Sequence, residues 1–268
     1  MMKKLKLQTE RMLAHVEDGV GWITFNQPEK RNAVSHDMWL AIPEIISSFT
    51  ADDDVRVVVM KGAGDRAFVS GADISEFEDK RGSADAVKTY GEATTAANAA
   101  LRSLEKPLIA MIRGYCIGGG LGIALTADLR VSAEDGQFAI PAAKLGLGYG
   151  YSGVKELVNI VGPSFAKEIF FTARRFNAQE AKDMGLVNRV VPVADLESTT
   201  KELAGLIAGN APLTVKAAKA AINEATKDPA QRDIAKVDAM VAQCFASQDY
   251  IEGRRAFMEK RKPQFAGR

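Results

Sequence analysis

Cysteine and histidine are scarce in this sequence. Its 268 residues include two cysteines, Cys116 and Cys244, and two histidines, His15 and His36. Two cysteines provide neither a disulfide framework nor the paired spacing of a zinc site. Two histidines leave almost no basis for a histidine-centred triad or a multi-histidine metal site. We therefore predict no metal ion, and we expect a reducing compartment, the cytoplasm.

Long apolar runs and an excess of one charge are also lacking. No window approaches the roughly 18 apolar residues of a membrane span. The basic N-terminal segment MMKKLKLQTER lacks the apolar stretch of a secretory signal. The net charge is +1, so electrostatics favour neither nucleic acid nor a membrane surface as a partner. The length suits one large domain, or one domain with an appendage.

The sequence does contain strands that alternate with helices. Apolar runs predict strands within residues 20–30 (with a turn at Gln27-Pro28), 55–64, 107–114, 129–133 and 187–192. Helical periodicity covers residues 36–49 and 83–104, and helices rich in Ala, Lys and Glu dominate from residue 194 onward. This order predicts an α/β core over residues 1–200 and a C-terminal helical region over residues 201–268.

Three consecutive glycines, Gly118–Gly120, open a predicted helix directly after an apolar run. A dinucleotide-binding fingerprint would need a glycine at the sixth place, where Ile123 stands, and no Gly-Lys-Ser/Thr follows as in a phosphate-binding loop. The first N–H groups of a helix lack helical partners, and the helix dipole favours negative charge there. The cluster could therefore hold an oxygen that becomes anionic during a reaction, or could serve tight packing alone.

A second cluster, GDRAFVSGADISEF at residues 64–77, has the same form. It follows a buried strand and precedes a predicted helix, for which Asp73 is a candidate N-cap. Two strand–glycine–helix junctions can each direct one N–H group at a common point. The sequence therefore predicts an oxyanion hole built from backbone donors.

Four motifs occur in order between about Gly21 and Lys262: PEKRNAVS, AFVSGADI, KPLIAMIRGYCIGGGLGIALTADLRVS and FTARRFNAQEAKDMGLVNRVV. Together they resemble the enoyl-CoA hydratase/isomerase family, the crotonases. The resemblance implies a repeated ββα superhelix with a C-terminal helical trimerisation region. It implies homotrimers, often paired into hexamers, and a place in fatty acid metabolism. It also implies an acyl-CoA thioester as substrate, with coenzyme A as part of that substrate and no separate cofactor.

The resemblance assigns roles by position. The N–H groups that hold the enolate-like oxygen belong to Ala72 and Gly119. The residues expected along coenzyme A are Lys30, Arg31, Ala33, Ala72, Asp73, Ile74, Phe257 and Lys260, the last two possibly through a neighbouring subunit. A lysine or arginine beside a phosphate is physically reasonable.

The catalytic acids of this family are absent. Hydratases add water with two glutamates, at positions occupied here by Gly122 and Ala142, and the aspartate of other members falls at Gly150. None of these can transfer a proton. Methylmalonyl-CoA decarboxylases carry a tyrosine in this loop that aligns with Tyr149, and a phenol can protonate an enolate. Tyr149 is thus the catalytic candidate, although packing beneath a loop would equally explain it.

Several interpretations therefore stay open. The overall resemblance predicts a lyase or isomerase, nominally an enoyl-CoA hydratase, whereas the side chains present suit a decarboxylase-like enzyme or a non-catalytic CoA-thioester binder. RNA binding has little support from a near-neutral chain. Asp128 resembles a structural position, Cys116 suits a packed thiol, and Glu92 could reach the acyl pocket.

Overall fold

The computed structural model describes residues 2–73 and 84–268. Its larger sheet has seven strands. The strands β3, β4, β6, β8 and β11 run parallel to one another, β2 is antiparallel to β3, and β1 is antiparallel to β2. In spatial order these strands are β1 (Lys3–Lys4), β2 (Met12–Glu17), β3 (Val20–Phe25), β4 (Val57–Gly62), β6 (Leu108–Ile112), β8 (Leu129–Ala133) and β11 (Arg189–Val191).

A second sheet of four short strands lies over the core. Its order is β10 (Phe176–Asn177), β9 (Gln137–Ala139), β7 (Tyr115–Ile117) and β5 (Ala67–Val69). In each of the consecutive pairs β4–β5, β6–β7 and β8–β9, the first strand belongs to the large sheet and the second to the small sheet. A helix follows β7. The predicted repeat of two strands and a helix is therefore confirmed.

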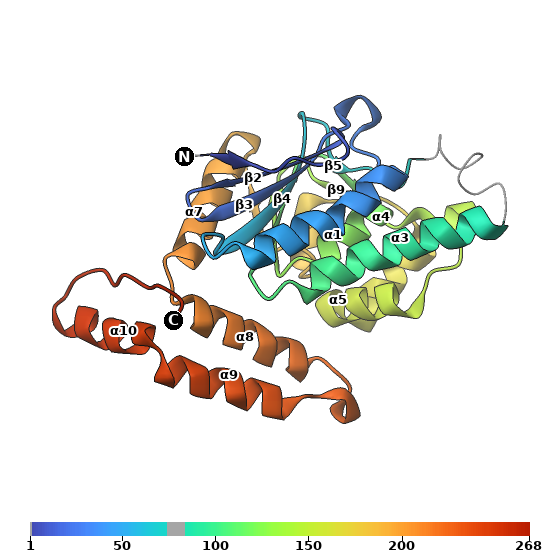
Figure 1. Cartoon of the computed structure of the whole chain (residues 1–268). Coiled ribbons are helices and arrows are strands. Elements are labelled where there is room, and N and C mark those ends of the chain that lie inside the picture. Colours follow the sequence, from blue (N-terminus) through green and yellow to red (C-terminus); the bar gives the residue numbers. More distant parts are fainter. Residues whose placement is uncertain (1, 74–83) are drawn as a thin grey trace.

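Helices cover both faces of the large sheet (Figure 1). On one face, a large apolar core joins the sheet to the helices α1 (His36–Ala51), α3 (Ala84–Ser103), α4 (Gly119–Leu125), α5 (Tyr151–Thr172) and α6 (Ala178–Asp183). On the other face, α7 (Leu196–Ala208) packs over Trp22, Val57 and Val59 in a smaller cluster. Short 3₁₀ turns lie at η1 (Pro28–Lys30), η3 (Pro141–Leu145), η4 (Val193–Asp195) and η5 (Pro229–Gln231).

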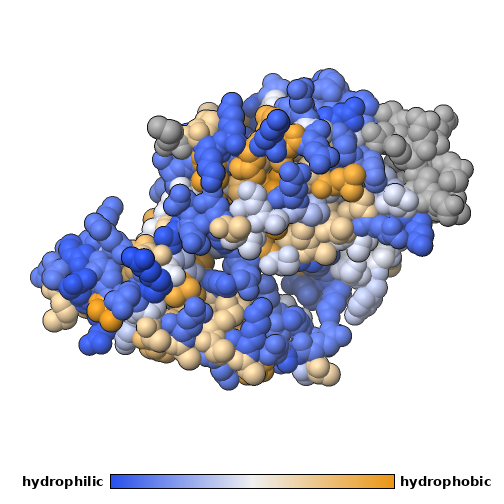
Figure 2. All heavy atoms as spheres, in the orientation of Figure 1, coloured by the Kyte–Doolittle hydropathy of each residue, from blue (hydrophilic) through white to orange (hydrophobic). Residues whose placement is uncertain are grey.

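The last helices form an arm that stands off the core (Figure 1). They are α8 (Pro212–Ala225), α9 (Ile234–Ala246) and α10 (Gln248–Met258). Hydrophilic residues predominate on the face shown in Figure 2, with hydrophobic patches on both core and arm. Among the described helices, none is both long enough and apolar enough to cross a membrane.

The predicted elements appear with shifted ends. The strand predicted within residues 20–30 ends at Phe25, because Pro28 lacks an N–H group and begins a 3₁₀ turn instead. Predicted helix 36–49 continues to Ala51. The strands β5, β7, β9 and β10 were not predicted, since two or three residues carry too little periodicity to be detected.

A buried guanidinium joins β8 to its surroundings. Arg130 is 4% exposed, and it donates hydrogen bonds to the carbonyl oxygens of Leu186 (2.7 Å), Ala127 (2.7 Å) and Ala124 (3.3 Å). Burial lowers the pKa of this side chain to about 10, so it stays charged at neutral pH.

Replacing Arg130 with methionine should destabilise the fold strongly. The substitution keeps an apolar stem of similar length but removes all three hydrogen bonds, and it leaves the carbonyl groups of Leu186 and Ala127 without this donor. We expect a loss of about 3 kcal/mol in the free energy of unfolding in urea. Arg189→Met, at an exposed position in β11, is the matched control and should change stability by less than about 0.5 kcal/mol. Equal losses in both variants would contradict the assigned role.

Candidate active site

The first glycine-rich junction follows β5 and is held by the loop before α1. Val34 N donates to Gly71 O at 2.8 Å, and Asp73 N donates to Val34 O at 3.0 Å. These two bonds define a parallel bridge between Val34 and Ala72, in which the N–H group of Ala72 points away from Val34. That N–H group donates to no described residue. It is therefore available to a ligand.

The second junction joins β7 to α4. Gly118 has φ 56° and ψ −117°, a conformation that favours glycine, and its N–H group donates to Ala139 O at 2.8 Å. Gly119 is the first residue of α4, so its N–H group has no helical partner, and it has none elsewhere among the described residues.

The small sheet brings the two junctions together, because β5 and β7 are paired with Val69 opposite Cys116. A Cβ atom on Gly119 would lie 3.8 Å from Ala72 N, in the space that both donors border. A Cβ atom on Gly120 would instead lie 2.1 Å from Val69 O. The three glycines therefore serve different purposes. Gly118 adopts the positive φ of the turn, Gly119 leaves space beside the two N–H donors, and Gly120 allows α4 to pack closely on β5.

Tyr149 stands beside the next turn of α4. A Cβ atom on Gly122 would lie 3.6 Å from the Tyr149 hydroxyl oxygen, and one on Gly153 would lie 2.7 Å from the ring carbon Cε1. The ring also packs edge-on against Phe170, with the ring centroids 5.0 Å apart. Two glycines and one aromatic ring therefore surround the phenol, and its hydroxyl lies beside Gly122.

The electrostatic surroundings keep this phenol protonated. Burial raises the pKa of Tyr149, and the carboxylate of Glu156 raises it further, while the guanidinium of Arg102 opposes the shift. Glu156 and Arg102 form an ion pair with each other. The hydroxyl forms no hydrogen bond to a described residue, so it can donate one to a ligand at neutral pH.

The other acid positions carry no acid. Ala142 lies in η3, where the preceding Pro141 has its Cδ atom 3.9 Å from a Cβ atom placed on Gly118. A Cβ atom on Gly150 would meet nothing within 4 Å. Within the described part of the chain, Tyr149 is thus the titratable side chain that the structure places beside the first turns of α4.

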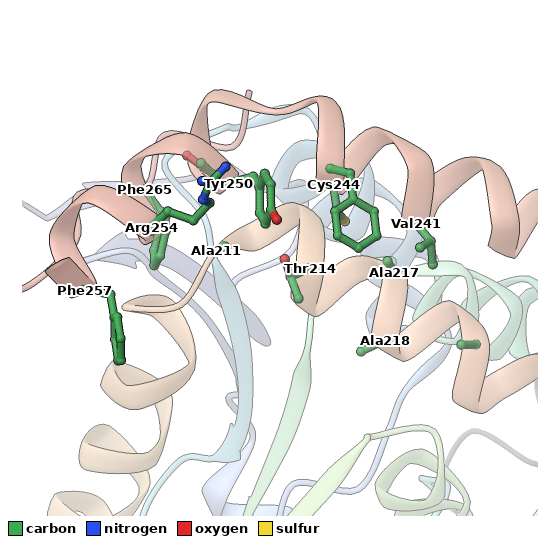
Figure 3. A pocket seen from close by; sticks show the side chains of 14 residues that line it. Ala211, Thr214, Ala217, Ala218, Val241, Cys244, Tyr250, Arg254, Phe257 and Phe265 are labelled. Atoms are coloured by element: carbon green, nitrogen blue, oxygen red, sulfur yellow. The ribbon is translucent and has the colours of Figure 1, made fainter.

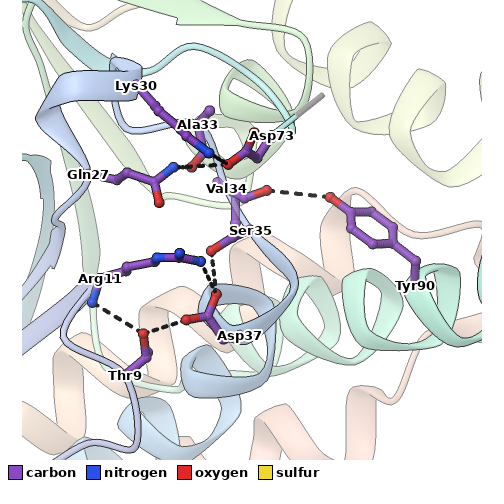
Figure 4. Close-up of polar contacts among 10 residues, drawn as sticks. All are labelled: Thr9, Arg11, Gln27, Lys30, Ala33, Val34, Ser35, Asp37, Asp73 and Tyr90. Carbon is purple, nitrogen blue, oxygen red and sulfur yellow. Dashed lines mark hydrogen bonds and ion pairs between the residues drawn. The ribbon is translucent and has the colours of Figure 1, made fainter. Parts of the chain in front are cut away.

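Several predicted coenzyme A residues lie together beside Ala72 (Figure 4). Asp73 is 4% exposed, and its Oδ2 atom accepts hydrogen bonds from Lys30 Nζ at 2.7 Å and from Gln27 Nε2 at 3.2 Å. Gln27 Nε2 also donates to Ala33 O at 3.2 Å. Lys30 and Asp73 therefore form an ion pair at the first junction, and the helix predicted after Asp73 lies outside the described residues.

Arg31 lies near a second cation, Arg175, which the sequence motifs did not indicate as a site residue. The guanidinium of Arg31 lies 5.2 Å from the ring centroid of Tyr115, and so does that of Arg175. Neither arginine forms an ion pair with a described carboxylate. The two adjacent arginines in FTARRF were the available sign of a cationic site. Sequence alone could not place Arg175 near Arg31, because their proximity depends on the pairing of β10 with β9 and of β9 with β7 in the small sheet.

Other candidates lie elsewhere. Phe257 is on α10 and Lys260 follows it, in the arm that Figure 1 shows far from α4. In Figure 3, Phe257 lines a cavity of about 710 Å³ between α8 and α10. One chain therefore does not bring these two residues to Ala72, and Ile74 lies outside the described residues.

The surroundings of Asp128, Cys116 and Glu92 do not indicate a catalytic role. Asp128 accepts hydrogen bonds from Leu108 N and Lys219 Nζ, and Lys219 belongs to α8, so Asp128 ties the arm to the core. Burial raises the pKa of Cys116, which suits an unreactive thiol. The Glu92 side chain is 67% exposed beside Lys88. No group of three or more histidine, cysteine, aspartate or glutamate side chains suited to a metal ion occurs among the described residues.

Comparison with known proteins places these features in context. Residues 15–268 match the sequence profile described as enoyl-CoA hydratase/isomerase. The short-chain-enoyl-CoA hydratase of Clostridium acetobutylicum is 34% identical, covering 96% of this chain and 97% of that protein. The carnitinyl-CoA dehydratase of Escherichia coli O157:H7 is 35% identical, covering 92% and 94%.

Solved structures agree with the sequence relatives. An enoyl-CoA hydratase/carnithine racemase from Magnetospirillum magneticum superposes with a TM-score of 0.90 at 34% identity, and the match covers 97% of each chain. The enoyl-CoA hydratase of Bacillus anthracis gives a TM-score of 0.87 at 31% identity, covering 97% of this chain and all of that one.

Proposed function

The chain belongs to the enoyl-CoA hydratase/isomerase family, whose members are acyl-CoA enzymes, and we propose that it forms a thioester enolate and protonates it with Tyr149. The observation that supports this proposal is the position of the Tyr149 hydroxyl oxygen, 3.6 Å from a Cβ atom placed on Gly122. Decarboxylation of a malonyl-type thioester is the reaction that best suits these groups.

The proposed steps need no strong base. The bond between the α carbon and the carboxylate breaks, carbon dioxide leaves, and the electron pair moves into the thioester as an enolate. The N–H groups of Ala72 and Gly119 stabilise the enolate oxygen, because preorganised donors act most strongly where negative charge develops. Tyr149 then gives its proton to the α carbon, and the phenolate regains a proton from solvent.

Coenzyme A would lie along the cations beside the first junction. Lys30, Arg31 and Arg175 are the candidates for its phosphate groups, because guanidinium and ammonium groups form strong charge-assisted hydrogen bonds with phosphate. We propose that Phe257 and Lys260 reach a thioester bound by a neighbouring copy in a homotrimer or a hexamer, since they lie far from Ala72 within one chain (Figure 1).

Hydration is the second candidate. Relatives named short-chain-enoyl-CoA hydratase and carnitinyl-CoA dehydratase favour it, and they match this chain over more than nine-tenths of its length. The side chains oppose it, since Gly122 and Ala142 cannot activate a water molecule. A thioester-binding protein without turnover is the third possibility, because Gly122, Ala142 and Gly150 provide no acid.

A panel of thioesters would separate these functions. The purified protein is incubated with crotonyl-, 3-hydroxybutyryl-, malonyl- and methylmalonyl-CoA, and product masses are followed. We expect loss of carbon dioxide from a malonyl-type compound and no change in crotonyl-CoA. Gain of water by crotonyl-CoA would instead establish hydration, and saturable binding without any mass change would indicate a binder.

A further inference from the structure

A polar cavity of about 520 Å³ lies at the carboxyl ends of β3, β4 and β6. Along β4, Val58 and Met60 face the large core, whereas Val57 and Val59 face α7. Lys61 continues the second set and lines the cavity. The cavity therefore opens on the α7 face of the large sheet, opposite the face that carries the small sheet and the candidate active site.

Two cations, Lys61 and Arg113, line this cavity. Lys61 forms no ion pair with a described residue, and its Nζ atom lies 5.4 Å from the ring centroid of Trp22. The Nε atom of Arg113 is enclosed and has no hydrogen-bond partner among the described residues. Its nearest carboxylate oxygen, on Asp135, is 3.6 Å away. Both cations thus retain hydrogen-bonding capacity.

The strand register places these two cations on one face. Lys61 is paired with Met111 across β4 and β6, and Arg113 follows Met111 by two residues. Residues two apart on an extended segment point to the same side. The carboxylate of Glu197, which also lines the cavity, is already paired with Lys201 at 2.7 Å. Because Arg113 is paired with Asp135, Lys61 is the lining cation left without an ion-pair partner among the described residues.

Neutral polar and apolar groups complete the lining. The His15 ring stacks on Trp22, and burial, reinforced by nearby cations including Lys61, lowers its pKa, so the ring is uncharged at neutral pH. Thr24 adds a hydroxyl group. Met111 and Leu196 add apolar surface on one side of Lys61. Leu13 lies on its other side beyond Thr24, because Leu13, Thr24, Lys61 and Met111 form one row across the sheet. Polar and apolar groups thus share the lining, and a few convergent polar groups are what fixes a ligand in small-molecule sites.

We propose that this cavity binds a small organic anion, with a carboxylate or phosphate head between Lys61 and Arg113 and a short apolar body against Met111 and Leu196. Guanidinium and ammonium groups supply the charge-assisted hydrogen bonds that such heads accept. The site is separate from the thioester site, and it stands whether or not Tyr149 takes part in catalysis.

The two tryptophans make the proposal measurable. Trp22 lies beneath Lys61, so a Trp39→Phe background leaves Trp22 as the single tryptophan reporter. Propyl phosphate and butyrate are titrated separately at constant ionic strength while tryptophan emission is followed. We expect a saturable change with at least one of them. Lys61→Met should weaken its binding about tenfold or more, because one charge-assisted hydrogen bond is lost.

The controls separate binding in the cavity from nonspecific effects. Lys182→Met changes an exposed lysine on α6 outside the cavity and should titrate like the background protein. Calorimetric titration of the unmodified chain guards against a folding defect in the tryptophan variant. Response to one probe alone identifies the head group as phosphate or carboxylate. Absence of saturation with both, or equal affinity in Lys61→Met, would overturn the proposal.

Discussion

Replacing Gly119 with proline should slow thioester turnover by about 10²–10³-fold, the usual effect of removing one oxyanion donor. Proline lacks the N–H group that would face the enolate oxygen. It is also well tolerated at the first position of a helix, which Gly119 occupies in α4. The preceding Gly118 has no Cβ atom to clash with the proline ring. The fold should therefore persist while the donor is lost.

Two further variants show whether the N–H group itself matters. Gly119→Ala keeps the N–H group and places a Cβ atom 3.8 Å from Ala72 N, as proline also does. The turnover that Gly119→Pro loses beyond Gly119→Ala therefore measures the contribution of the N–H group. Ile234→Pro puts proline at the first position of α9, at an exposed site in the arm, and should leave turnover unchanged. Native rates in Gly119→Pro, with an active wild-type protein, would exclude Gly119 from the site.

The donor pair illustrates what the sequence could predict. Each junction is a local pattern, a buried strand followed by glycines and then a helix, and such patterns can be recognised without coordinates. That the two junctions meet depends on the pairing of β5 with β7. These strands have three residues each, so they gave no periodic signal of their own. The likeness of the two junctions suggested the convergence, and the family resemblance assigned the donors to Ala72 and Gly119.

Contacts distant in sequence set the limit elsewhere. The Tyr149 side chain lies between Gly122, Gly153 and Phe170. Only the packing of α4 against α5 shows that these three residues surround the same side chain. Lys61 and Arg113 share a cavity because of the register between β4 and β6. Neither arrangement follows from residue type or local spacing, since Tyr149 is 27 positions from Gly122 and 21 from Phe170, and Lys61 is 52 positions from Arg113.

Replacing Tyr149 with phenylalanine should slow decarboxylation by about 10²–10⁴-fold, the usual contribution of a positioned general acid. The substitution removes one oxygen atom and keeps the ring that packs on Phe170 and Gly153, so thioester affinity and stability should change little. Tyr151→Phe is the matched control. Tyr151 lies two residues away with 76% of its surface exposed, and loss of its hydroxyl should leave the rate unchanged.

The pH dependence gives this prediction a second measurement. A phenol donates its proton only while it is protonated, and an ordinary tyrosine ionises near about pH 10. Burial and the Glu156 carboxylate raise the pKa of Tyr149 above that value. The Tyr149-dependent rate should therefore be flat through neutral pH and fall only in the alkaline range above about pH 10. In Tyr149→Phe, the Tyr149-dependent part of the rate and its decrease at alkaline pH should both be absent.

The combination of both readouts distinguishes catalysis from packing. A merely structural tyrosine would affect stability and thioester binding, and its loss would not remove one limb of a pH profile. A catalytic phenol has the opposite signature, since binding survives while the rate and its alkaline limb disappear together. If Tyr149→Phe decarboxylates at the native rate, the enolate takes its proton from another donor, and Tyr149 only closes the space beside Gly122.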